Sequence, residues 1–102
     1  MEQNKTVYMI QIQYSTDDYD GVDTFLFENR EKAIKKLHKL IEIEKQTAWI
    51  QDAYEEDGSI NEDYELDENL NDKDACCLWW NFKCLSDYYY HTFIDLREIE
   101  VQ

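Results

Sequence analysis

Negative charge is concentrated in one part of this chain and limits how that part can fold. Residues 52–74 hold 11 acidic residues and one Lys, and they carry most of the formal net charge of −14 of the 102-residue sequence. Like charges at this density repel one another and oppose compaction, so the segment at about 52–74 is expected to form an acidic loop. The length fits a single domain over residues 1–102, and the hydrophobic content of 43% predicts a folded core for the rest.

The beginning of the chain predicts a β-hairpin. Apolar and aromatic residues alternate with polar ones at 6–14, and residues 22–28 carry Phe25 and Phe27 on one face. Both patterns are typical of strands that bury one side. An Asp-rich turn that ends in Gly21 joins them.

A helix is expected directly after the hairpin. Asn29 is a favourable N-cap residue in front of Arg30. The helix is expected to continue through Ala53, because no Pro or Gly interrupts the pattern before Gly58. The apolar residues at three- and four-residue spacing that define its buried stripe are Ala33, Ile34, Leu37, Leu40 and Ile41.

Two further strands are expected after the acidic loop. Residues 75–85 are dense in large apolar side chains, and residues 88–101 predict a long strand with a bulge near Arg97, where the alternation changes phase. The order β-β-α-loop-β-β predicts an α+β fold, a four-stranded antiparallel sheet with one main helix on one face. Trp79 and Trp80 are adjacent, so one of them is expected to lie on the exposed face or at an interface.

The polar residues form no pattern that specifies catalysis or a cofactor. His38 and His91 are the only histidines, and no spacing specifies a catalytic triad with either. Cysteines 76, 77 and 84 lack the paired spacing of a zinc site. The acidic segment lacks the Gly that a calcium loop needs at its sixth position. We therefore expect a protein that is not an enzyme and that has no cofactor and no specific metal site.

The acidic segment is the feature that points to a function. Duplex DNA carries one charge per roughly 1.7 Å of axis, so a compact protein needs clustered carboxylates to compete for a phosphate-binding groove. The expected partner is a basic protein, a nucleic-acid-binding nuclease, and not nucleic acid or a membrane, which the net charge repels. The expected partner-binding residues are Asp52, Glu55, Glu56, Asp57, Glu62, Asp63, Glu65, Asp67, Glu68, Asp72 and Asp74.

Two other interpretations fit the same composition. The acidic segment can serve only to keep a small protein in solution. The aromatic strands can then bind another protein or a second copy of the chain, because Trp and Tyr are common at interface hot spots. Under this alternative the chain is a protein–protein interaction module or a homodimer. In either case the first residues lack the apolar run of a signal peptide, so a cytoplasmic location is expected.

A short, strongly acidic, proline-free α+β chain resembles the phage-encoded inhibitors of bacterial defence nucleases, which include anti-CRISPR proteins and other DNA mimics. The resemblance rests on the acidic stretch from Glu55 to Asp74, and the hairpin-then-helix opening at 25–34 is similar to that of many small phage proteins. It implies a phage or mobile-element origin, a location in the bacterial host cytoplasm and a CRISPR effector nuclease as partner. The inhibitor would occupy the groove that takes the target duplex, or block a conformational step.

Overall fold

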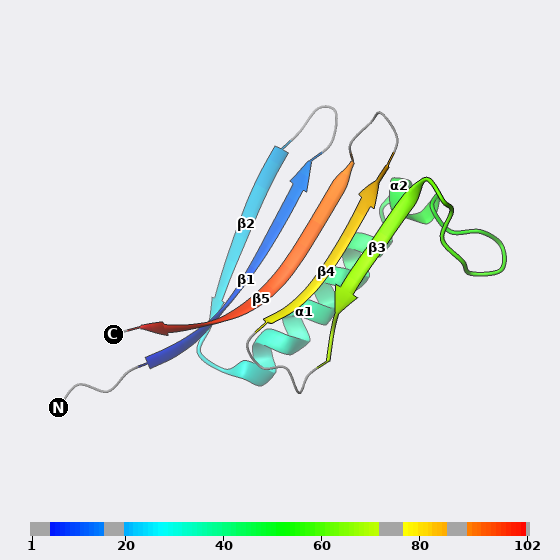
Figure 1. Ribbon diagram of the computed structural model, residues 1–102. Helices are drawn as coiled ribbons and strands as arrows, with labels where there is room; N and C mark the ends of the chain where they lie inside the picture. The colour runs from blue at the N-terminus through cyan, green and yellow to red at the C-terminus, as the bar shows by residue number, and fades with distance from the viewer. Residues whose placement is uncertain (1–4, 16–19, 72–76, 86–89, 102) are drawn as a thin grey trace.

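The computed structural model describes residues 5–15, 20–71, 77–85 and 90–101, which form one antiparallel sheet and two helices (Figure 1). The sheet order is β2-β1-β5-β4-β3, so the first and last strands of the chain pair and β2 and β3 form the edges. The strands are β1 (Lys5–Ser15), β2 (Asp20–Phe27), β3 (Tyr64–Asn69), β4 (Cys77–Cys84) and β5 (His91–Val101), and the helices are α1 (Arg30–Lys45) and α2 (Ala48–Gln51).

The acidic segment contains a strand, β3, so the sheet has five strands and the described residues are mostly strand. The prediction of a four-stranded antiparallel sheet with one main helix and an acidic loop over 52–74 is therefore wrong. β3 pairs with β4, with Leu66 opposite Phe82. Tyr64 and Leu66 pack against the core, and the exposed Glu65 and Asp67 alternate with them. An edge strand tolerates such charge because its outer side faces solvent, and charge there also discourages pairing with other chains.

Helix α1 begins where the sequence predicts. The side chain of Asn29 accepts a hydrogen bond from the backbone N–H of Lys32 at 3.0 Å, which caps one of the unpaired amides of the first turn. Ala33, Leu37 and Ile41 are buried against the sheet. The predicted stripe is therefore the face that closes the core.

The predicted continuation of this helix through Ala53 is wrong. Thr47 has an extended conformation, with ψ at 147°, and separates α1 from α2. Its hydroxyl donates to the carbonyl of Glu44 at 2.8 Å. The break redirects the chain so that Ile50 and Ala53 are both buried in the core. Tertiary packing thus overrides a sequence that has no local helix breaker.

The core lies between the helices and one face of the sheet. Ile10 is opposite Leu96 and Ile12 is opposite Ile94 in the β1–β5 pair, and all four are buried. Pairing runs without interruption from Ser15–His91 to Lys5–Val101, so the bulge predicted near Arg97 is wrong. The change of phase arises because Glu98 and Glu100 continue the helix-side row and are exposed.

The other face of the sheet carries no helix in Figure 1, and we name it the open face. Trp80 is completely buried on the helix side, whereas the adjacent Trp79 is only half-buried on the open face. The prediction that the two rings point to opposite sides is confirmed. Phe93 and Met9 also lie half-buried on the open face, which is therefore less polar than an ordinary solvated sheet surface.

Candidate acidic binding edge

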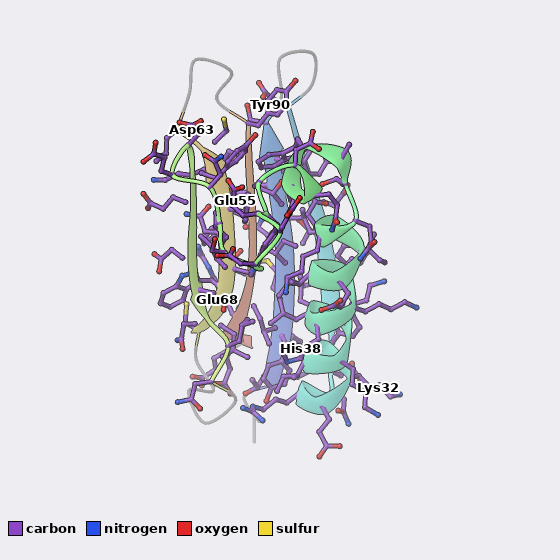
Figure 2. All side chains as sticks on the ribbon, turned by 90° about the vertical axis from the view of Figure 1, so that its right-hand side faces the viewer. Lys32, His38, Glu55, Asp63, Glu68 and Tyr90 are labelled. Carbon is purple, nitrogen blue, oxygen red and sulfur yellow. The ribbon has the colours of Figure 1, made fainter. Side chains whose placement is uncertain are left out.

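Nine exposed carboxylates follow one another between the end of α2 and the end of β3. In Figure 2, Glu55, Asp63 and Glu68 are labelled on the hairpin, the turn and β3, whereas Lys32 is labelled on α1. We name the nine residues the acidic edge: Asp52, Glu55, Glu56, Asp57, Glu62, Asp63, Glu65, Asp67 and Glu68. The predicted binding residues Asp72 and Asp74 lie outside the described residues.

A tight hairpin-like loop holds the first carboxylates of the acidic edge. Tyr54 and Ile60 form an isolated β-bridge at its base. The N–H of Glu55 donates to the carbonyl of Ser59 at 2.8 Å, and the N–H of Gly58 donates to the carbonyl of Glu55 at 3.0 Å. Gly58 has φ of 88°, a left-handed conformation that suits glycine. The loop therefore has a defined turn, and we name residues 54–60 the acidic hairpin.

Asp57 is fixed inside this turn. Its carboxylate accepts from the Ser59 hydroxyl at 2.6 Å and from the Ser59 N–H at 3.0 Å. Both hydrogen bonds hold the pKa of Asp57 below its ordinary value, because the donors favour the charged form, and the Ser59 hydroxyl has a larger effect than the Ser59 amide. The charge of Asp57 thus belongs to an ordered turn.

Backbone hydrogen bonds tie the following turn to the rest of the fold. The N–H of Asn61 donates to the carbonyl of Ala53 at 2.7 Å. The N–H of Leu85, just beyond β4, donates to the carbonyl of Asp63 at 2.7 Å. Both ends of the turn that carries Glu62 are therefore attached to structured elements.

An aromatic cluster connects the acidic hairpin to the sheet. Trp49 of α2 packs edge-on against Phe82 and Tyr90, at 5.5 and 5.6 Å between ring centroids, and stacks on Tyr64 at 6.4 Å. Tyr54, at the base of the hairpin, lies 6.2 Å from the Phe82 ring. These rings pack around the buried Phe82 and give the acidic hairpin an ordered base.

Most of the acidic edge is free to meet an external cation. Glu65 forms an ion pair with Lys83 at 3.5 Å, and it is the only member of the edge with an ion pair within the described part of the chain.

Burial raises the pKa of Tyr54 above its ordinary value, and the negative charge of Glu68 adds a smaller effect in the same direction. Tyr54 therefore stays a neutral phenol at the foot of the hairpin.

Most of the positive charge of the described residues lies on α1. Lys32, Lys35 and Lys39 are exposed on this helix, and none of them forms an ion pair among the residues that the structure describes. Lys36 lies over the ring of Phe25, 5.0 Å from its centroid. The fold thus separates opposite charges and does not neutralise the acidic edge internally.

His91 lies on the open face, where it stands opposite Lys83 of β4. Its Nε2 is 2.8 Å from Oδ1 of Asn81, whereas the neighbouring Ser15 hydroxyl donates to Asp20 at 2.6 Å. The imidazole is therefore not placed as a base for that hydroxyl. Burial lowers the pKa of His91 most, and the positive charge of Lys83 lowers it further, so the ring is neutral at pH 7.

Within the described ranges, no group of three or more His, Cys, Asp or Glu side chains could hold a metal ion. Cys77 and Cys84 are half-buried, and neither forms a disulfide within the described ranges; Cys76 lies outside the described residues. No helix in the described part of the chain has the length and apolar character needed to cross a membrane.

Sequence reasoning missed one ionic feature, at the centre of the open face. Asp95 is 1% exposed, and its Oδ2 accepts from Nε of Arg97 at 2.6 Å. Asp95 and Arg97 are two positions apart in the sequence, and this spacing alone places them on the same face of a strand. The burial of Asp95, however, is a tertiary property, because this residue lies in a central strand between Trp79 of β4 and Gln11 of β1.

No protein-family model matches this sequence, and neither a curated protein nor a solved structure matches it.

Proposed function

We propose that this protein is a non-enzymatic inhibitor that binds the basic nucleic-acid groove of a CRISPR effector or a similar defence nuclease. In this proposal the acidic edge takes the place of DNA phosphates, and Lys and Arg side chains of the groove bind its carboxylates. The observation that carries the proposal is the placement of nine unneutralised or weakly paired carboxylates on an ordered hairpin, a turn and an edge strand.

The charge density of the acidic edge supports this assignment. The six residues of β3 extend about 20 Å at roughly 3.3 Å per residue. A duplex of the same length carries about 12 phosphate charges, at one per roughly 1.7 Å. β3 itself carries three carboxylates, Glu65, Asp67 and Glu68, and the other six members of the acidic edge precede it on the hairpin and turn. The acidic edge as a whole therefore offers nine negative charges, a number of the same order as the charge of a duplex as long as β3.

The ordered backbone of the acidic hairpin also supports the proposed mode of binding. A carboxylate on a disordered loop loses conformational freedom when it binds, and that loss reduces affinity. The hydrogen bonds of Glu55, Gly58 and Asn61 fix the backbone of the acidic hairpin before a partner arrives. Binding can then use the electrostatic attraction with a smaller entropic cost.

A charge-reversal experiment with a matched control tests the proposal. The triple variant Glu56→Lys, Glu62→Lys, Asp67→Lys changes three exposed residues of the acidic edge. The control Asp23→Lys, Glu31→Lys, Glu42→Lys changes the net charge by the same amount on β2 and α1. Competition with a target duplex for a purified, guide-loaded CRISPR effector is measured for both. The first variant should lose competition and the control should keep it.

Salt dependence provides the second readout. If six or more carboxylates replace phosphates, affinity for the effector should fall by about a thousandfold or more between ~50 and ~200 mM salt. Equal competition by the two triple variants, or an affinity that does not change with salt, would exclude this mode of binding.

A further inference from the structure

A buried carboxylate with one unsatisfied oxygen lies on the open face. Oδ1 of Asp95 has no hydrogen-bond partner and no exposed surface among the described residues. Only Oδ2 is used, by the Nε of Arg97. A buried charged oxygen without a donor is costly, and native structures rarely keep one without a reason. The position therefore calls for an additional hydrogen-bond donor.

The surroundings of Asp95 define what that donor can be. Trp79 stands directly opposite Asp95 on β4, and Gln11 stands opposite it on β1. Trp79 is half-buried, so part of its ring faces outward. Arg97, the donor to Oδ2, has 54% of its side chain exposed, and a group that reaches Oδ1 requires the side chains around Asp95 to rearrange. The open face thus offers an aromatic surface beside a carboxylate acceptor.

A guanidinium group matches this pair of features. It is planar, it stacks on aromatic rings, and its N–H donors form a fork that fits a carboxylate. A lysine ammonium is a compact, strongly hydrated charge that lacks both the plane and the fork. The chemistry of the site therefore favours an arginine side chain over a lysine side chain.

The site is continuous with the acidic edge. Asn69 of β3 stands opposite Trp79, and the exposed Asp67 lies in the next row, opposite Asn81. Two strand spacings, about 10 Å, separate β3 from β5. A basic partner seated on the acidic edge can therefore reach Asp95 with one long side chain.

We propose that the partner of the acidic edge inserts an arginine side chain onto the open face, where its guanidinium stacks on Trp79 and donates to Oδ1 of Asp95. The inference rests on the proposed function, because it assigns the same basic partner a second contact. It adds a specific side chain to an interface that charge alone does not specify.

Nona-arginine and nona-lysine peptides are suitable probes, because both carry the same charge and only one carries guanidinium groups. We expect wild-type protein to bind nona-arginine about tenfold more tightly than nona-lysine, as measured by fluorescence anisotropy. Asp95→Asn and Trp79→Ala should bring the two affinities close to one another. The indole N–H signal of Trp79 in NMR spectra should shift with nona-arginine and not with nona-lysine.

Matched variants separate this site from general acidity. Asp67→Asn removes an exposed carboxylate of the same face, and it should weaken both peptides alike. Trp79→Phe keeps an aromatic ring and should retain much of the arginine preference. The NMR shift is measured on the wild-type protein, so it tests the site even if Asp95→Asn fails to fold.

The outcomes distinguish the two proposals. Equal wild-type affinities for the two peptides, or an arginine preference that survives both substitutions, would overturn the arginine site and leave the acidic edge intact. Unchanged binding of both peptides by the acidic-edge triple variant would count against the proposed function instead. A wild-type dimer in sedimentation that dissociates on Trp79→Ala would show that a second copy covers the open face, and this would also overturn the arginine site.

Discussion

The substitution Trp49→Ala tests whether the shape of the acidic edge matters as well as its charge. Replacing Trp49 leaves the net charge unchanged. Its ring packs against Tyr64, Phe82 and Tyr90, and Phe82 is also the ring that Tyr54, at the base of the acidic hairpin, lies against. Removing the indole should loosen the hairpin while the carboxylates remain. A partner that recognises arranged carboxylates should then bind less tightly.

The magnitude follows from burial and ring geometry. Truncation of a fully buried Trp or Phe to Ala costs about 3–5 kcal/mol, and Trp49 is half-buried, which reduces the packing part to about 2 kcal/mol. Three aromatic contacts add about 0.5 kcal/mol each at the low end of their range. We therefore expect a loss of about 3.5 kcal/mol in the free energy of unfolding, which most small domains survive at 25 °C.

Urea denaturation and hydrogen exchange measure the two parts of this prediction. The amide of Glu55 reports on the acidic hairpin, the amide of Asn61 on its attachment to Ala53, and the amide of Ile94 on the central strands. In Trp49→Ala, protection at Glu55 and Asn61 should fall more than protection at Ile94, because Phe82, the ring that Tyr54 of the hairpin base lies against, loses a packing partner. Affinity for the effector should fall in parallel, without any change in net charge.

Trp79→Ala is the control for this experiment. Trp79 is also half-buried, but it lies on the open face and makes no ring contact among the described aromatic residues. Its truncation should cost about 2 kcal/mol or less and leave the protection of Glu55 and Asn61 at wild-type values. If Trp49→Ala lowered protection equally at Glu55 and Ile94, or left the binding of effector unchanged, the reasoning about shape would be refuted.

Three further substitutions have defined expected outcomes. Leu37→Ala should lower the free energy of unfolding by about 3 kcal/mol in urea titrations, because Leu37 is fully buried in the middle of α1. Gly58→Ala should destabilise the acidic hairpin by about 1–2 kcal/mol, seen as faster exchange of the Glu55 amide, because φ of 88° is strained for alanine. The pKa of His91 is lower in the folded than in the unfolded state, so His91 in the unfolded chain binds a proton at a higher pH. The contribution of His91 to the free energy of unfolding should be fully present above about pH 6.5 and should be lost as the pH falls through the pKa of the folded state. In thermal unfolding, His91→Gln should reduce the difference in Tm between pH 7.5 and 5.5, and an unchanged difference would contradict this assignment.

The sequence predicted those elements whose signals are local. The hairpin follows from alternation at 6–14 and 22–28, and the start of α1 follows from the Asn29 cap, which the structure confirms. β3 could not be found in this way. Tyr64 and Leu66 alternate with acidic residues, and such a segment becomes a strand only through pairing with β4, which follows it in the chain. That pairing is a tertiary effect, and no local propensity encodes it.

The candidate site was predicted by residue type but not by geometry. Nine of the eleven expected carboxylates lie on the acidic edge, and the other two lie outside the described residues. The density of charge suggested a loop, whereas hydrogen bonds of Asp57 and Asn61 give the segment a fixed turn. Asp95 was missed because its burial depends on the two strands that flank β5, and a single sequence does not show which strands are adjacent.

Edge protection accounts for part of the negative charge and leaves part of it unexplained. Glu65, Asp67 and Glu68 lie on an edge strand, where charge prevents pairing with other chains. The same reason does not apply to Glu55 and Glu56, which lie on the acidic hairpin and not on the sheet edge. A solubilising role would not require these two residues to be held by an ordered turn over an aromatic base, because a flexible loop solubilises equally well. The acidic hairpin is therefore the part of the acidic edge where a binding function explains more than solubility does.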